Sequence, residues 1–109
     1  MIDWDRVADL RAEVGEDGFS EVIELFLEET DEVIARLAAS NPAQLGRDLH
    51  FLKGSSLNLG FRDMAQTCQD GERACGAGAA ATVDVAGVIR LYHASKSAFL
   101  AGLGKLSAA

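Results

Sequence analysis

Apolar residues recur three and four positions apart along almost all of this 109-residue chain. This spacing puts them on one face of an α-helix, whereas strands would alternate with a period of two. Only one proline, Pro42, is present, and aromatic residues are sparse. The chain is therefore predicted to be all-α. The longest apolar stripe consists of Phe19, Val22, Ile23, Phe26, Leu27, Val33, Ile34 and Leu37.

The N-terminal part of the chain is predicted to form two helices. A short one covers residues 4–14 and ends at Gly15, because its apolar positions keep helical spacing only up to that glycine. Asp17 is predicted to cap the second helix, which carries the long apolar stripe. The other face of this second helix is strongly acidic.

The next helix has clear signals at both ends. Asn41 is predicted to cap it, with Pro42 at the first helical position, where proline has no amide hydrogen to lose. Gly60 is a natural place for it to stop. Its apolar stripe is formed by Leu45, Leu49, Leu52 and Leu59.

Two more helices complete the predicted fold. One begins at Phe61 and ends near Cys75, and residues 76–81 then form a loop of glycine and alanine. Thr82 precedes the last helix, whose stripe extends to Leu106. Short breaks between long amphipathic helices favour an antiparallel up-and-down four-helix bundle with a short additional N-terminal helix. We expect one domain, residues 1–109.

Charge and cysteine content narrow the possible partners. The formal net charge of −7 argues against binding to a nucleic-acid backbone, which requires a basic patch. Cys68 and Cys75 lie seven apart, which matches neither a metal or redox motif nor a disulfide framework. His93 has no carboxylate or cysteine at a metal-ligand spacing, so no metal is expected.

The same features indicate where the protein acts. No apolar run approaches the roughly 20 residues that cross a bilayer, and the N-terminus is acidic and unlike a signal peptide. We therefore expect a cytoplasmic monomer that binds other proteins and not membranes. No Gly-rich nucleotide-binding motif appears, so the chain is not expected to bind ATP or to phosphorylate itself.

The segment around His50 carries the most information about function. His50 lies well over a quarter-turn from the leucine stripe of its helix, so it is predicted to face solvent. Its neighbours on the same face include Gly46, Lys53 and Gly54, one turn away, and Leu57, two turns away. Each interior glycine weakens a helix by roughly 1 kcal/mol relative to alanine. Glycines beside an exposed histidine suggest that another molecule approaches closely.

Simpler interpretations exist for each of these residues. A lone surface histidine is usually solvated, a surface lysine usually aids solubility, and interior glycines often permit helix packing. The combination in one patch of an imidazole, an amine, bare backbone and the exposed Leu57 favours a docking and group-transfer site over the simpler interpretations.

The sequence also resembles the histidine-containing phosphotransfer (HPt) domains, through His50-x-x-Lys53-Gly54-Ser55-Ser56-x-x-Leu59-Gly60. The resemblance continues in Met64-Ala65, Cys68 and Glu72, and covers nearly the whole chain.

The resemblance implies a phosphorelay role. Nε2 of His50 would accept a phosphoryl group from a receiver-domain aspartyl phosphate, or from a sensor or hybrid histidine kinase, and pass it to a response-regulator receiver. Lys53 would offset the phosphate charge, and the Mg²⁺ would belong to the receiver. Such a protein is a phosphoryl carrier and not an enzyme. The alternative is a helical bundle that binds receivers without phosphotransfer.

Docking residues are also predicted. Gly46 and Gly54 would let the receiver approach, and Leu57 would supply apolar contact. Phe51, Ile23 and Leu27 are further apolar candidates, although Phe51 could equally belong to the core. Ser55 is a candidate for orienting the imidazole or the phosphate, whereas Ser56 lies on the core stripe.

Overall fold

The computed structural model describes residues 1–108, with side chains through residue 105, and it is all-helical across these residues. Its elements are α1 (Trp4–Leu37), α2 (Pro42–Leu59), α3 (Arg62–Gly76), the 3-10 helix η1 (Ala80–Thr82) and α4 (Val85–Ala108). The side chain of Leu106, predicted to end the last stripe, lies outside the described residues. No helix in this part of the chain is long and apolar enough to span a membrane.

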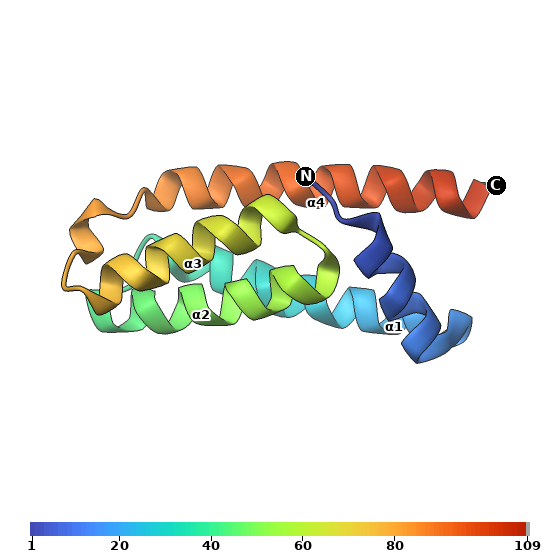
Figure 1. Ribbon diagram of the computed structural model, residues 1–109, viewed down its shortest axis with the longest axis horizontal. Helices are drawn as coiled ribbons and strands as arrows, with labels where there is room; N and C mark the ends of the chain where they lie inside the picture. The colour runs from blue at the N-terminus through green and yellow to red at the C-terminus, as the bar shows by residue number, and fades with distance from the viewer. Residues whose placement is uncertain (109) are drawn as a thin grey trace.

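The two predicted N-terminal helices are one kinked element in the structure. Gly15, with φ 79° and ψ 163°, is the non-helical residue inside α1. The helix resumes directly after it, so Asp17 lies in the first turn and the prediction that it is the cap is wrong. In Figure 1 the blue segment before the kink turns away from the rest of α1 and lies across one end of the molecule.

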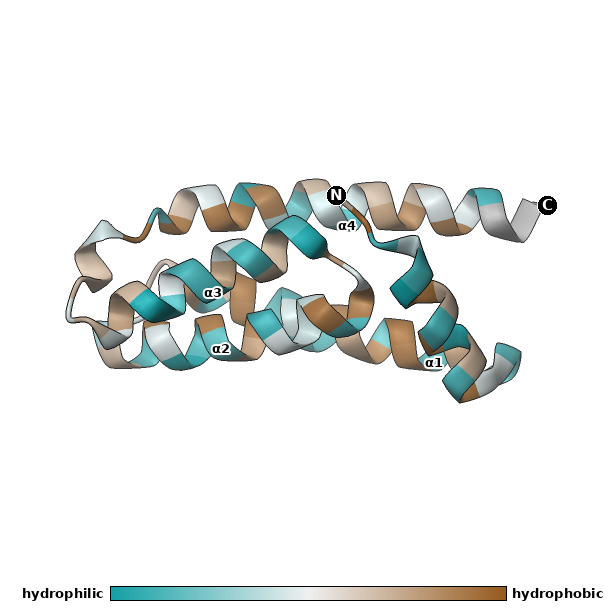
Figure 2. Ribbon diagram, in the orientation of Figure 1, coloured by the Kyte–Doolittle hydropathy of each residue, from teal (hydrophilic) through white to brown (hydrophobic). Residues whose placement is uncertain are grey.

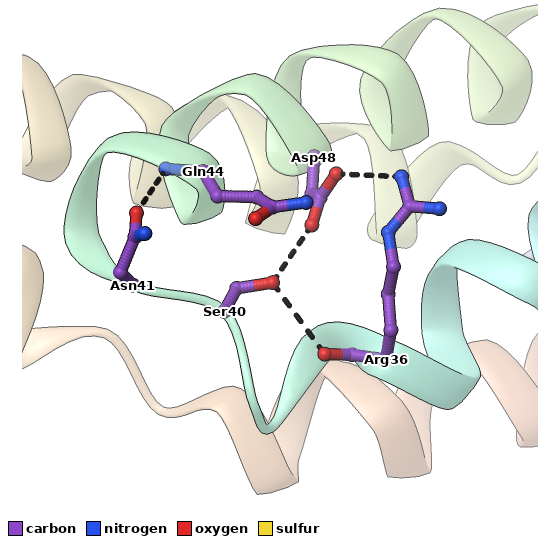
Figure 3. A network of polar contacts seen from close by, with 5 residues as sticks. All are labelled: Arg36, Ser40, Asn41, Gln44 and Asp48. Carbon is purple, nitrogen blue, oxygen red and sulfur yellow. Dashed lines mark hydrogen bonds and ion pairs between the residues drawn. The ribbon is translucent and has the colours of Figure 1, made fainter.

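The predicted signals around α2 are confirmed. Asn41 accepts a hydrogen bond from the backbone of Gln44 at 2.9 Å, Pro42 occupies the first turn, and Gly60 ends the helix with φ 75°. The preceding turn is held by Asp48, whose carboxylate accepts hydrogen bonds from Arg36 at 3.1 Å and Ser40 at 2.8 Å (Figure 3). This network fixes α2 against the end of α1.

The last helix begins later than predicted. Residues 80–82 form the short helix η1, and α4 starts at Val85. Asp84 accepts a hydrogen bond from the backbone of Gly87 at 2.9 Å, so it satisfies one of the free amides of the first turn. Thr82 instead donates its hydroxyl to the carbonyl of Ala79.

The long helices pack around one apolar core. Helix α2 lies between α1 and α3, and α4 contacts both of those elements. Successive helices run in opposite directions in Figure 1, and apolar and polar segments alternate along the helices in Figure 2. The largest fully buried apolar side chains are Tyr92, Phe61, Phe99, Leu37, Leu49, Leu52, Leu59 and Met64.

Candidate functional site

His50 lies on the outer face of α2. Its side chain is 68% exposed, whereas those of Leu49 and Leu52 are completely buried. The prediction that His50 faces solvent is therefore confirmed. The cause is local, because the leucine stripe turns one face of α2 into the core and leaves the opposite face to water.

Helix α3 supplies the partner of this histidine. Nδ1 of His50 lies 2.6 Å from Oε2 of Glu72, and Nζ of Lys53 donates to Oε1 of the same carboxylate at 2.8 Å. Glu72 thus bridges two residues that are one turn apart on α2. All three side chains belong to one polar cluster, which we call the His50 cluster.

The Glu72 contact determines which nitrogen of His50 is available. An ionised carboxylate only accepts hydrogen bonds, so the proton of the neutral imidazole is held on Nδ1. The lone pair then lies on Nε2, which has no hydrogen-bond partner among the described residues. The exposed side of the ring is therefore its nucleophilic side.

Glu72 is ionised at neutral pH. The hydrogen bond from Lys53 lowers the pKa of Glu72; partial burial opposes this effect, and the hydrogen bond with His50 reinforces it. With Glu72 negative and Lys53 positive, the two charges of this ion pair cancel. The charge of Lys53 is already balanced before any phosphoryl group arrives.

The two flanking glycines differ in their surroundings. A Cβ added at Gly54 would meet nothing within 4 Å, so the backbone there is open to an approaching molecule. A Cβ at Gly46 would lie 3.4 Å from Cβ of Cys75, so that glycine also permits close packing between α2 and α3.

The predicted apolar docking residues separate into two groups. Leu57 is 58% exposed and Phe51 is 38% exposed, so both lie on the surface and Phe51 is not a core residue. Ile23 and Leu27 are buried in the core at 6% and 8% exposure. The expectation that they are exposed for docking is wrong, because their face of α1 packs inward.

The structure does not support an orienting role for Ser55. This residue lies about 140° around the helix from His50 and is buried, as is Ser56. Glu72 makes the contact with the imidazole instead.

Sequence reasoning noted Glu72 only through the family resemblance and gave it no role. A physical signal was nevertheless present. Gly60 and Phe61 form the turn between α2 and α3, and His50 and Glu72 are nearly equally distant from it. Positions equally distant from a tight turn lie opposite each other in an antiparallel helix pair.

No group of three or more potential metal ligands is found among the described residues. Both cysteines are free thiols. Burial, followed by the nearby charge of Glu72, raises the pKa of Cys68 to about 12, so this thiol is unreactive at neutral pH.

Comparison with known proteins gives one result that covers most of the chain. The family model described as Hpt domain matches residues 21–107. No curated protein and no solved structure matches the chain. The matched region contains all of α2 and α3, and therefore the whole His50 cluster.

Proposed function

The chain belongs to the Hpt domain family, whose members are phosphocarrier modules of two-component phosphorelays, and on this premise we propose that His50 is its phosphoryl-carrying residue. His50 accepts the group from a receiver-domain aspartyl phosphate, or from a sensor or hybrid histidine kinase. It then transfers the group to a response-regulator receiver. The main support is the pairing of Nδ1 with Glu72, together with an exposed Nε2.

The transfer step follows from this pairing. The Nε2 lone pair attacks phosphorus, the N–P bond forms, and the bond between phosphorus and the aspartyl oxygen breaks. The aspartate leaves as a carboxylate, and the imidazole gains positive charge. Glu72, hydrogen-bonded to Nδ1, stabilises this charge in the way that a carboxylate stabilises an imidazolium in hydrolase triads. Reversal of these steps delivers the group to the next receiver.

Lys53 supports the reaction in two ways. Its hydrogen bond helps to hold Glu72 in place and keeps that carboxylate ionised. It also contributes positive charge near a phosphoryl group that carries about −2. Phosphoryl transfer depends mainly on positioning and charge neutralisation, so these contributions suit the reaction.

The receiver docks on the exposed face of α2. Gly54 provides an open approach to the backbone, and Leu57 and Phe51 provide apolar contact. At Gly46 the absence of a side chain lets α3 pack closely and leaves no bulk beside His50. The receiver brings its own aspartate and Mg²⁺. A face that combines exposed apolar and polar side chains in this way has the composition of a transient protein interface.

The proposal extends to the whole chain. We propose a single domain of residues 1–109, an antiparallel up-and-down four-helix bundle with an additional N-terminal helical segment, acting as a monomer in the cytoplasm. The chain needs an external phosphodonor, because it has no nucleotide-binding motif. The alternative function is receiver binding without phosphotransfer.

The test is incubation with phosphorylated receiver domains and Mg²⁺, followed by intact mass measurement at neutral or alkaline pH. We expect one added phosphate on the native chain and none on His50→Gln, with the helical circular dichroism of both unchanged. The matched control is His93→Gln, which alters an exposed histidine on α4.

Binding of receivers by the native chain without any added phosphate would favour the interaction-only alternative. Normal phosphate transfer by His50→Gln would refute the assignment of His50.

A further inference from the structure

A shallow hollow of about 440 Å³ lies beside His50, between the start of α2 and the end of α3. Its lining includes Arg47, His50, Gly46 and Glu72. Lys53 is not part of this lining and instead borders a different hollow, toward the C-terminal end of α2. The groups that share the open space beside the imidazole are thus Glu72 and Arg47.

Arg47 differs from Lys53 in its charge environment. Lys53 is about one quarter exposed and is paired with Glu72 at 2.8 Å. Arg47 is exposed and has no ion pair or side-chain hydrogen bond within the part of the chain that the structure describes. It is the cation in this hollow whose charge is not already balanced.

The position of Arg47 in the helix suits it to the phosphoryl group. Arg47 precedes His50 by three residues, so the two side chains are neighbours on the surface of α2. A guanidinium is always charged near neutral pH, and its planar array of donors matches two oxygens of a phosphate. The hydrated ammonium of Lys53 is held toward Glu72 on α3.

We propose that Arg47 binds the oxygens of the phosphoryl group on Nε2 of His50 and is a second positioning cation of the transfer reaction. This inference rests on the proposed function. Lys53 then acts mainly by fixing Glu72 and the imidazole, and its charge is partly offset by Glu72, while Arg47 supplies a positive charge that is not already paired. The incoming charge of about −2 favours such a group, since the charge of Lys53 is already balanced by Glu72.

The experiment uses the full chain and a small phosphodonor, phosphoramidate, so that receiver docking does not enter the result. Nε2 attacks phosphorus, the N–P bond to His50 forms, the N–P bond of the donor breaks, and ammonia leaves. The variants are Arg47→Gln and Arg47→Lys. The matched control is Arg90→Gln, which removes the same charge from an exposed arginine on α4.

Two quantities are measured: the rate of His50 phosphorylation, and the pH midpoint of the phosphoryl ionisation by ³¹P NMR of the phosphorylated chain. We expect Arg47→Gln to slow phosphorylation about fivefold, the scale of a charge-assisted contact at a surface. We expect its midpoint to rise by about half a unit, because a nearby cation favours the doubly ionised phosphate. Arg47→Lys should recover part of both changes, and Arg90→Gln should match the native chain.

Native values of both quantities in Arg47→Gln would overturn the inference and leave the function of His50 intact. Equal changes in Arg90→Gln would also overturn it, because the effect would then come from net charge alone. If neither phosphoramidate nor any phosphorylated receiver modifies His50 of the native chain, the proposed function itself fails.

Discussion

At the residue scale, the reactivity of His50 depends on the hydrogen bond between its Nδ1 and Glu72. Glu72 holds the proton of the imidazole on Nδ1 and leaves Nε2 toward solvent. A free histidine in water has no such fixed orientation or tautomer. The carboxylate of Glu72 therefore sets the tautomer and the orientation of the imidazole before the reaction begins.

Replacement of Glu72 separates its charge from its geometry. Glu72→Gln keeps an oxygen that can accept from Nδ1 but removes the charge that stabilises the imidazolium, whereas Glu72→Ala removes both. We expect phosphorylation to be slowed about tenfold in Glu72→Ala, about 1.4 kcal/mol of activation free energy, and less in Glu72→Gln. Stopped-flow transfer from a phosphorylated receiver measures both rates. Equal, native rates in the two variants would show that the contact has no role in transfer.

Gly54 offers a second test at the same scale. Because a Cβ there meets nothing within 4 Å, Gly54→Ala should stabilise the protein by up to about 1 kcal/mol. Gly54→Gln should likewise keep the helix but weaken receiver binding by about tenfold or more, since its side chain occupies the docking face. Thermal unfolding and titration calorimetry measure the two effects.

Gly104 on α4 is the control for Gly54, because it is exposed and also has open space around it. Gly104→Gln should leave receiver binding unchanged. If Gly54→Gln binds the receiver as tightly as Gly104→Gln does, the docking face lies elsewhere.

At the element scale, the turn between α2 and α3 sets the register that brings Glu72 to His50. Gly60 adopts φ 75°, and its carbonyl accepts a hydrogen bond from the backbone of Asp3 at 2.7 Å. Ile2 pairs with Phe61, which is almost completely buried. The N-terminal residues thus fasten the turn that fixes the position of α3.

The Gly60 turn can be tested against another glycine with the same backbone conformation. A Cβ at Gly60 would lie only 2.6 Å from the carbonyl oxygen of Asp3, whereas Gly78, with φ 77°, has nothing within 4 Å. We expect Gly78→Ala to cost about 1 kcal/mol from left-handed strain alone. Gly60→Ala should cost about 3 kcal/mol or more, because the clash is added to that strain.

Urea unfolding of both Gly60→Ala and Gly78→Ala measures these losses. Equal losses would mean that the contact with Asp3 adds nothing to the stability of the turn.

At the scale of the whole molecule, charge is unevenly distributed. Residues 1–37 contain 12 acidic and 3 basic residues, whereas residues 38–109 contain 5 acidic and 7 basic residues. The excess negative charge is therefore confined to the first 37 residues, and the rest of the chain has a slight positive excess. Across the bundle, Asp31 of α1 accepts hydrogen bonds from Tyr92 and Lys96 of α4.

These contacts predict how stability depends on pH. Burial alone would raise the pKa of Asp31, but the hydrogen bonds from Lys96 and Tyr92 outweigh it, and the pKa of Glu72 is also lowered. Groups with lowered pKa stabilise the fold above the ordinary carboxyl range and lose that effect as pH falls through their folded pKa. We therefore expect the melting temperature to fall below about pH 4.

At alkaline pH the dependence is reversed, and stability is expected to fall as the pH rises. Burial, followed by the hydrogen bond to Asp31, raises the pKa of Tyr92, so its contribution is complete below about pH 10 and is lost above that value. Differential scanning calorimetry across the pH range measures both limbs. Asp31→Asn should reduce the loss of melting temperature at acid pH. If that loss is the same size in the variant, it comes from other carboxylates.

The sequence by itself determined the helices, most of their ends and the exposure of His50. These depend on apolar spacing, on Asn41 and Pro42 at one end of α2 and on Gly60 at the other, all of which act within a few residues. Only the tertiary structure decided which residue contacts His50. Glu72 is 22 positions away, and a contact over that distance depends on how the turn and the packing set two helices against each other.

The tertiary structure likewise decided which apolar residues remain on the surface. Ile23 and Leu27 belong to the apolar stripe of their helix, whereas Leu57 lies away from the leucine stripe of α2, so spacing assigns each residue to a face but does not say what covers that face. Burial depends on which neighbouring helix covers each face, so α1 places its apolar stripe in the core while Leu57 remains in solvent. Spacing along one helix defines its faces, but only the packing of all the helices determines which face meets water.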